Sequence, residues 1–436
     1  MIDITTIGII ALIILLLFFL TGIELVCAMG IIGFIGFSYI VSFKAACNLL
    51  AKDFFDTLTS YGLTVIPVFV LMGQIAYYSG IAKKLYDATY KFIGHVPGGL
   101  AMTTVVGATL FKAMCGSTLA TCATFASVAV PEMKRYGYGM SLSTGTVASV
   151  GTLGFLLPPS IILIIFGIIT EQSIGRLFLA GVIPALLISL FFIFIIFGWA
   201  KINPTIAPKG EKSPWRERAR AFPEIFYVGI VFFVVIGGIM KGIFSPTEAG
   251  TIGVLAVLIL GLTHAKGQFG FKGLIKSMDE SLRTACMVLM LVAASTVLGH
   301  FLAVTEIPLI AANWITSLTV DRAIIMIMII LIYLIGGSFI DDLAFMILAT
   351  PIFYPVIIKL GYDPIWFGVM IGITLMIGVV IPPVAICVFV VKNITGESFS
   401  TIYSGVYPFL LSLVACALLL FLFPQIATFL PSLLMG

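Results

Sequence analysis

Two stretches of this sequence combine glycine with adjacent prolines in the middle of long apolar segments. The first break is Gly154–Ser160 and the second break is Gly378–Pro383. Because proline lacks a backbone N–H and fixes φ, a regular helix cannot continue through either pair of prolines. Carbonyl groups released in this way coordinate small hard cations such as Na⁺. The four carbonyls concerned belong to Gly154, Leu157, Gly378 and Ile381.

A short polar stretch precedes each break and separates two apolar segments. The first tip is Lys112–Thr118 and the second tip is Gly336–Asp342. The second tip carries two adjacent carboxylates, and an acid inside a membrane segment marks a functional site by default. The alternative is that this tip reaches water and the acids cap a helix that begins at Leu343. The candidate ligands in the two tips are Cys115, Gly116, Ser117 and Thr118, and Ser338, Asp341 and Asp342.

Lys112 is the basic residue of the first tip. Its long side chain can run along a hairpin to the cytoplasmic interface, as buried lysines near membrane surfaces do. Otherwise its ammonium is fixed at the tip, where it either occupies a cation site or pairs with an anionic substrate.

For the two proline breaks, the plainer interpretation is that the prolines only kink packed helices. Their recurrence in both halves favours a binding site.

The composition is that of a membrane protein with many crossings. The 436 residues are 61% hydrophobic and 10% charged, whereas a soluble chain carries about a quarter charged residues. Apolar runs long enough to span a bilayer recur along the chain, for example at 4–20 and 177–200. No basic segment of the signal-peptide type precedes the first run. The seven cysteines show no CxxC spacing and the three histidines no metal-ligand spacing.

The sequence matches itself at a separation of 224 residues. Pro158-Pro159 then meets Pro382-Pro383, and Gly137-Tyr138 meets Gly361-Tyr362. One offset that holds over so long a span predicts duplicated halves. We place the first repeat at 1–200, a cytoplasmic linker at 201–224 and the second repeat at 225–436.

Each repeat is expected to contain five crossings and one re-entrant hairpin. In the first repeat the hairpin covers about 98–131 and the broken helix 141–172. In the second repeat they cover about 323–358 and 365–394. Because five is odd, the second repeat must be inverted relative to the first. The fold class is therefore an all-α polytopic membrane protein with two inverted repeats of the elevator type.

The distribution of basic residues orients this arrangement. With the linker in the cytoplasm, sixteen of the 23 Lys and Arg residues lie on the cytoplasmic side and six on the outer side. This excess agrees with the positive-inside rule and places both termini in the periplasm. Outside the tips, Glu248 and its repeat partner Glu24 are interpreted as structural pivots, with Glu248 capping the helix that follows it.

The chain resembles the large membrane subunit, of DctM type, of tripartite ATP-independent periplasmic (TRAP) transporters. The residues that carry the resemblance are Phe244–Gly250, Lys134–Tyr138 and the first break. The resemblance covers essentially the whole chain. It implies an elevator-type carrier that takes up small organic anions across the bacterial inner membrane, driven by a Na⁺ gradient. It also implies two partners, a small membrane subunit of DctQ type and a periplasmic substrate-binding protein.

Two departures from that family pattern concern the ion sites. Lys112 and Cys115 stand where the family usually has small hydroxyl residues, and Ile381 stands where it usually has threonine. We therefore expect the Lys112 ammonium to replace one Na⁺. The first ion site, or its lysine substitute, comprises Lys112, Cys115, Gly116, Gly154, Leu157 and Pro158. The second comprises Ser338, Asp341, Gly378, Ile381 and Pro382. Substrate is assigned to Ser117, Thr118, Ser160 and Asp342.

The sequence thus predicts secondary uptake of a carboxylate or sulfonate, with the hairpins and broken helices (95–175 and 303–405) sliding against a scaffold (1–94 and 176–302). Three alternatives remain open: a stand-alone proton-coupled carrier, a channel or binding-only subunit, and an intramembrane enzyme using Asp341 or Asp342. We expect no catalytic residue, no nucleic-acid partner and no cofactor other than Na⁺.

Overall fold

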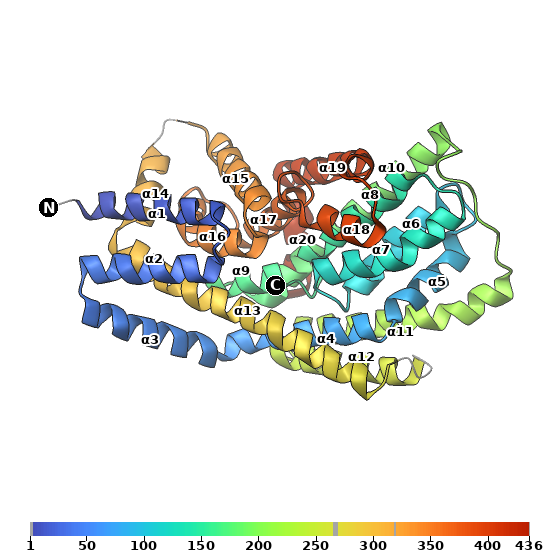
Figure 1. Cartoon of the computed structure of the whole chain (residues 1–436), viewed down its shortest axis with the longest axis horizontal. Coiled ribbons are helices and arrows are strands. Elements are labelled where there is room, and N and C mark those ends of the chain that lie inside the picture. The colour runs from blue at the N-terminus through green and yellow to red at the C-terminus, as the bar shows by residue number, and fades with distance from the viewer. Residues whose placement is uncertain (1–2, 265–268, 318–319, 436) are drawn as a thin grey trace.

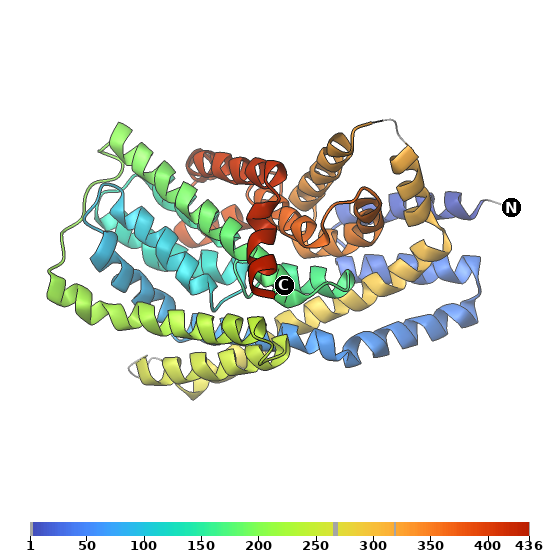
Figure 2. The same cartoon turned by 180° about the vertical axis from the view of Figure 1, so that it is seen from behind.

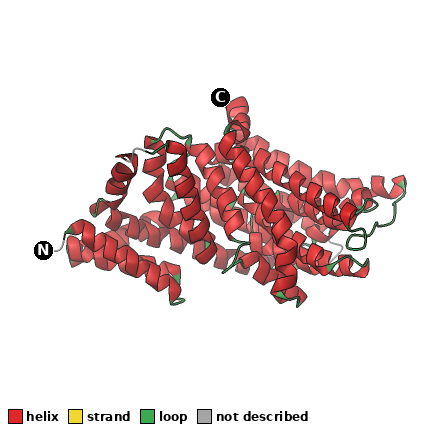
Figure 3. Cartoon of the chain, turned by 90° about the horizontal axis from the view of Figure 1, so that it is seen from above, coloured by secondary structure: helices red, strands yellow, loops and turns green. Residues whose placement is uncertain are grey.

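The computed structural model describes residues 3–264, 269–317 and 320–435. Every regular element within these ranges is helical, as Figure 3 shows. Eight of the described helical stretches are long and apolar enough to cross a membrane, and several shorter apolar helices accompany them. The expectation of an all-α polytopic membrane protein is confirmed.

The helices of the first 202 residues are interrupted by two single 3-10 turns, η1 (Tyr61–Thr64) and η2 (Thr152–Phe155). The α-helices are α1 (Ile4–Leu20), α2 (Leu25–Ile40), α3 (Phe43–Thr59), α4 (Val65–Tyr78), α5 (Ile81–Ile93), α6 (Gly99–Lys112), α7 (Thr118–Arg135), α8 (Met140–Gly151), α9 (Ile161–Ile169) and α10 (Ile174–Ile202).

A second series of helices follows after a non-helical segment. It comprises α11 (Trp215–Met240), α12 (Pro246–His264), α13 (Phe271–Val304), α14 (Ile307–Ser317), α15 (Arg322–Phe339), α16 (Asp342–Lys359), α17 (Pro364–Gly378), α18 (Ile386–Thr395), α19 (Phe399–Leu422) and α20 (Gln425–Met435).

Helix positions recur at the 224-residue separation. The first residues of α7 and α8 correspond to those of α16 and α17 without a shift, and those of α6 and α9 correspond to α15 and α18 with a shift of one residue. One difference is that α3, η1 and α4 correspond together to the single helix α13. The inverted orientation of the halves stays a prediction.

The two hairpins pack reciprocally on the broken helices. Hairpin α6–α7 and hairpin α15–α16 lie on opposite sides of the molecule's centre (Figures 1 and 2). Helix α7 packs against α18, and α16 packs against α9. Each hairpin therefore contacts the C-terminal part of the broken helix from the other half, so the four elements form one connected body.

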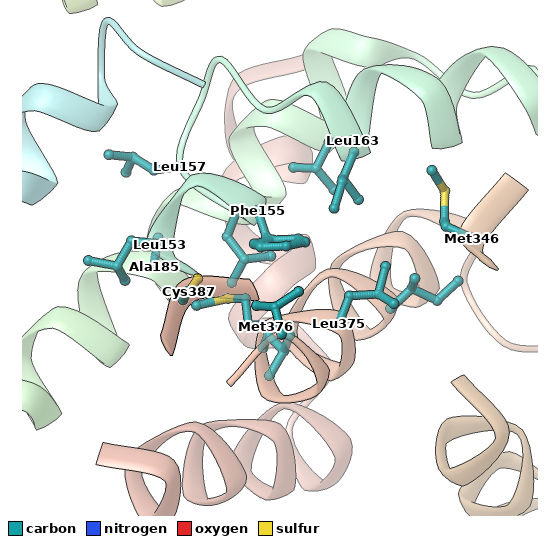
Figure 4. Packing of buried hydrophobic residues seen from close by; sticks show 14 of the residues in the cluster. Leu153, Phe155, Leu157, Leu163, Ala185, Met346, Leu375, Met376 and Cys387 are labelled. Atoms are coloured by element: carbon teal, nitrogen blue, oxygen red, sulfur yellow. The ribbon is translucent and has the colours of Figure 1, made fainter. Parts of the chain in front are cut away.

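The helices end a few residues before the prolines, with η2 ending at Phe155 and α17 at Gly378, and no helix continues through either pair. The Pro158–Pro159 and Pro382–Pro383 bonds are both cis. All of residues 151–160 are buried, whereas Pro382 and Pro383 are exposed on the surface of the chain. Figure 4 shows the apolar packing at the first break, where Phe155 lies close to Met376 of α17 and Cys387 of α18.

The segment between the halves is shorter than the predicted linker 201–224, because helices extend into it from both ends. Helix α10 continues to Ile202 and α11 begins at Trp215, directly after Pro214, whose fixed φ suits a helix start. The intervening segment is held by backbone hydrogen bonds, including Gly98 N to Ala207 O at 3.2 Å and Gly139 N to Ile206 O at 2.8 Å. It thereby ties together the ends of α6 and α8.

Candidate functional site

A cavity of about 130 Å³ lies between the two hairpins. The first tip contributes Ser117 and Thr118 to its wall, and the second tip contributes Asp341 and Asp342. Two tips that are more than 200 residues apart in sequence therefore reach the same space. Further walls come from both breaks and from the long helix α13, and include Gly116, Gly154, Val379, Thr284, Met287 and Val288.

The first tip is ordered by local hydrogen bonds and by contact with the first break. The Ser117 hydroxyl oxygen accepts a hydrogen bond from Ala120 N at 3.2 Å and so caps the start of α7. Gly116 lies directly against the carbonyl oxygen of Pro159, and a Cβ at this position would overlap that oxygen. Glycine is needed here because the backbone of the tip lies on the backbone of the break.

Lys112 ends α6 and is completely buried, with 0% of its surface exposed. Its Nζ donates a hydrogen bond to the carbonyl oxygen of Ser117 at 2.9 Å. A Cβ on Gly154 would lie 3.0 Å from Lys112 Cε and 3.1 Å from Cδ, and closer still to Nζ. The side chain therefore runs across the tip toward the first break, and the alternative that it extends to the membrane interface is wrong.

The hydroxyl of Ser160 is committed to the break itself. It donates to Phe155 O at 2.6 Å and accepts from Leu163 N at 3.3 Å, which caps α9. The side chain is buried and does not line the cavity. The structure thus places Ser160 apart from the other residues assigned to substrate.

The second tip is shorter than the sequence suggests, because α15 continues to Phe339. The Ser338 hydroxyl donates to Ile335 O at 2.8 Å within that last turn. Asp341 is the N-cap of α16, and its Oδ1 accepts from Ala344 N at 3.1 Å. The helix therefore begins at Asp342, one residue before the expected start at Leu343, and Asp342 is left with its carboxylate at the cavity wall.

The second tip also rests on its own break. A Cβ on Gly378 would lie 3.0 Å from the carbonyl carbon of Gly337. Val384 N donates to Ser338 O at 3.3 Å. Both tips therefore contact the backbone of the break in the same half through main chain, and the first tip adds the buried side chain of Lys112.

Six of the residues assigned from sequence line the cavity, and the other nine do not. The lining set is Gly116, Ser117, Thr118, Gly154, Asp341 and Asp342. The set outside the wall is Lys112, Cys115, Leu157, Pro158, Ser160, Ser338, Gly378, Ile381 and Pro382. Within the described ranges, no group of three or more His, Cys, Asp or Glu residues is placed to hold a metal ion.

Residues 12–426 match the model of the family described as "Tripartite ATP-independent periplasmic transporter, DctM component". The chain belongs to this family.

Characterised TRAP permeases resemble this chain over most of its length. It is 31% identical to the C4-dicarboxylate large permease protein DctM of Pseudomonas aeruginosa, over 88% of this chain and 89% of that protein. It is 31% identical to the sialic acid large permease protein SiaM of Vibrio cholerae, over 91% and 92%. The isethionate permease protein DctMQ of Oleidesulfovibrio alaskensis is 29% identical over 95% of this chain and 64% of its own length.

A solved structure with a similar fold is the YdaH transporter of Alcanivorax borkumensis. Its TM-score is 0.62 at 16% identity, over 87% of this chain and 88% of that one. This likeness concerns the fold alone.

The TRAP relatives are named as permeases, so the chain is a subunit of a transporter and not an enzyme. Together with the apolar helices, they show a multi-pass protein of the bacterial inner membrane.

Sequence reasoning missed the contribution of α13 to the cavity of this TRAP permease. Thr284, Met287 and Val288 line it, and the Thr284 hydroxyl donates to Glu280 O at 2.9 Å. A usable signal exists, because Ser277, Ser281 and Thr284 recur at helical spacing within a long apolar helix. That stripe marks the face that α13 turns inward.

Proposed function

We propose that this TRAP permease takes up a small organic anion across the inner membrane, driven by a Na⁺ gradient. The observation that carries the proposal is the cavity where the Asp341 and Asp342 carboxylates meet the Ser117 and Thr118 hydroxyl positions. Carboxylates and unwound main chain suit a cation, and hydroxyl groups beside a helix N-terminus suit an anion. A carrier that couples the two needs both in one space.

The Na⁺ ligands come from the second tip and the second break in this proposal. Asp341 supplies a carboxylate that already accepts a main-chain N–H, and Asp342 supplies a second one beside it. The carbonyls of Gly378 and Ile381 complete the set in this proposal, since the second break lies directly against the second tip, with Gly378 next to Gly337. Hard cations take several oxygen ligands, and this set consists of oxygen only. Bound Na⁺ supplies positive charge next to the substrate anion.

The substrate is a carboxylate or a sulfonate. The N-termini of α7 and α9 approach the cavity from the first half, and helix N-termini favour anions. The cavity holds about four water volumes, enough for a small acid group. The names of the TRAP relatives, which include C4-dicarboxylate, sialic acid and isethionate, support this class.

Transport proceeds by an elevator movement of the hairpins and broken helices. The reciprocal packing of α7 on α18 and of α16 on α9 supports one mobile body that carries the cavity. Helix α13, which packs along α2, α3 and α4, forms the fixed wall against which that body slides. In this scheme the halves are inverted repeats, and Na⁺ orders the second tip before substrate enters.

Both termini lie in the periplasm in our proposal. The positive-inside rule assigns Lys91 and the basic residues around Glu217 to the cytoplasmic side. In agreement, Lys91 Nζ forms a salt bridge with Glu217 Oε2 at 3.3 Å. The segment between α10 and α11 lies on this basic side, together with the ends of α6 and α8. As the family description is tripartite, the two other components are a small membrane subunit and a periplasmic binding protein.

The test is uptake of radiolabelled dicarboxylate, sialic acid and isethionate into proteoliposomes that contain this chain, its small membrane partner and the cognate binding protein. We expect uptake of one of these acids only with an inward Na⁺ gradient and with the binding protein. An equal rate with choline in place of Na⁺ contradicts Na⁺ coupling. If a proton gradient then drives uptake without the binding protein, the stand-alone carrier is the correct alternative.

A further inference from the structure

Lys112 is a buried cation whose surroundings differ from those of an ordinary ion pair. Its ammonium has three N–H donors, and its one hydrogen bond within the described residues goes to the Ser117 carbonyl at 2.9 Å. No salt bridge joins Lys112 to a carboxylate within that part of the chain. Its ionisable neighbours are the thiols of Cys115, Cys122 and Cys387. A buried ammonium without a counter-ion is costly, so its main-chain contacts must compensate for the lost hydration.

The position of the ammonium defines its role. It starts from the end of α6, crosses the first tip to Ser117 and lies against Gly154 of the first break. The contact is close enough that any side chain at Gly154 would displace Nζ. Lys112 Nζ therefore lies between the main chain of the tip and the main chain of the break. When it is protonated, it places a positive charge where transporters hold a cation between unwound segments.

The second half carries the opposite pattern at the corresponding positions. The residue 224 positions after Lys112 is Gly336, and those after Ser117 and Thr118 are Asp341 and Asp342. The second tip thus offers negative charge and no built-in cation. A free cation is attracted to the second tip and, when Lys112 is protonated, repelled from the first, because like charges repel strongly at short range in a buried site.

We propose that the Lys112 ammonium is a built-in cation that holds the first tip on the first break, so that exchangeable Na⁺ binds only at the second tip. This inference rests on the proposed Na⁺-coupled function and specifies its stoichiometry. Lys112 acts as a positioning residue, since it contacts the Ser117 main chain and lies outside the cavity wall. The carrier consequently moves one Na⁺ fewer per substrate than it does when this lysine is replaced by a small hydroxyl residue.

The experiment counts Na⁺ in purified, reconstituted complexes by equilibrium binding of ²²Na⁺, and separately measures the ²²Na⁺-to-substrate flux ratio. The variants are Lys112→Ser, which opens space and adds an oxygen ligand, and Lys112→Met, which keeps most of the chain length, one atom shorter, without charge or oxygen. We expect Lys112→Ser to bind and transport one additional Na⁺. Lys112→Met gains no ion and loses at least about tenfold in uptake, because one charge-assisted contact is worth about 1.5–3 kcal/mol.

Gly154→Ala tests the position of the ammonium independently. Its Cβ pushes Nζ away from the first break, so we expect lower uptake in the presence of Lys112. In the Lys112→Ser background the same substitution has little effect, because no long side chain remains to be displaced. An equal effect in both backgrounds contradicts the proposed contact.

A measurement with Lys112 intact keeps the inference testable if Lys112→Ser does not fold. Asp341→Asn should weaken all saturable ²²Na⁺ binding by roughly 10- to 100-fold when the second tip holds the only exchangeable site. One Na⁺ still bound with wild-type affinity in Asp341→Asn, or an unchanged Na⁺ count in folded Lys112→Ser, overturns the inference. Wild type that binds no Na⁺ while it still transports overturns the proposed Na⁺ coupling as well, and so the two failures are distinguishable.

Discussion

The two halves place the same elements at the same separation, yet their tips have opposite chemistry. In the first half Lys112 is buried beneath the tip, and residues 151–160 of the adjoining break are all buried, so that this break is closed. In the second half Pro382 and Pro383 are exposed, so that this break is open, and the tip carries Asp341 and Asp342 in place of Ser117 and Thr118. Both tips line the cavity with half-buried residues, so the fold is repeated, whereas the charge of the tips and the exposure of the breaks are not.

This difference shows how one backbone arrangement can serve two purposes. A hairpin on a broken helix leaves main-chain oxygens that need a positive charge nearby. In our proposal, the Lys112 ammonium provides that charge permanently in the first half. The two carboxylates of the second tip provide a site that Na⁺ from solution enters and leaves. Exchange of ions, and with it coupling to a gradient, is then confined to the second half.

The largest effect is expected from removing charge at the second tip. Asparagine caps helices about as well as aspartate, so Asp341→Asn keeps the start of α16 while it removes the negative charge. We expect the Na⁺ concentration for half-maximal uptake to rise by roughly 10- to 100-fold. This range takes the lost carboxylate–Na⁺ contact to be worth as much as a hydrogen bond to a charged group, about 1.5–3 kcal/mol. Na⁺ titration of uptake measures this shift.

Ser117→Asn is the matched control, because it substitutes the capping residue at the corresponding position of the first tip. Its Na⁺ requirement should stay within about twofold of wild type, the scatter expected of a substitution worth up to about 0.5 kcal/mol. A larger shift for Ser117→Asn than for Asp341→Asn would reverse the assignment of the ion site.

A smaller effect concerns access to the two breaks. A cysteine at Pro382 should react with a water-soluble maleimide about tenfold faster than one at Leu157, because buried backbone reacts only after local opening. Both are introduced into a chain in which the exposed cysteines Cys27, Cys47 and Cys286 are replaced by serine. Equal labelling rates for the two positions would remove the contrast between a closed and an open break.

The smallest effect lies outside the tips, at the start of α12. Ser245 N donates to Glu248 Oε2 at 2.8 Å and Glu248 N donates to Ser245 Oγ at 3.3 Å, which is a capping box. Ser245→Ala should cost about 1 kcal/mol and lower the melting temperature by about 2 °C. In the first half Glu24, which corresponds to Glu248, makes no side-chain cap hydrogen bond. Glu24→Ala should therefore have the same melting temperature as wild type. Uptake per folded molecule stays unchanged in both.

The sequence predicts the membrane class, the helix breaks and the two acidic positions, because proline chemistry and hydropathy act locally. It also identifies Glu248 as a cap, since the pattern Ser245-Pro-Thr-Glu248 is contained within one turn. The extension of α15 through Ser338 is not evident, because glycine at 336 and 337 suggests an earlier end and tertiary packing overrides that preference.

Other features depend on contacts between distant segments. The direction of the Lys112 side chain follows from the space left by Gly154, which lies 42 residues further along the chain. The withdrawal of Ser160 from the cavity follows from its bond to Phe155 O. The part played by α13 follows from how the hairpins pack, and periodicity alone gives only the stripe of small polar residues on that helix.

The most direct test of the account is hydrogen exchange at the two tips of the wild-type complex as Na⁺ is titrated against choline. Peptides covering 112–118 and 336–342 are compared in the same samples. The account predicts that Na⁺ slows exchange at the second tip, while the first tip is equally protected with and without Na⁺ because Lys112 already holds it. Na⁺-dependent protection of the first tip would contradict the account.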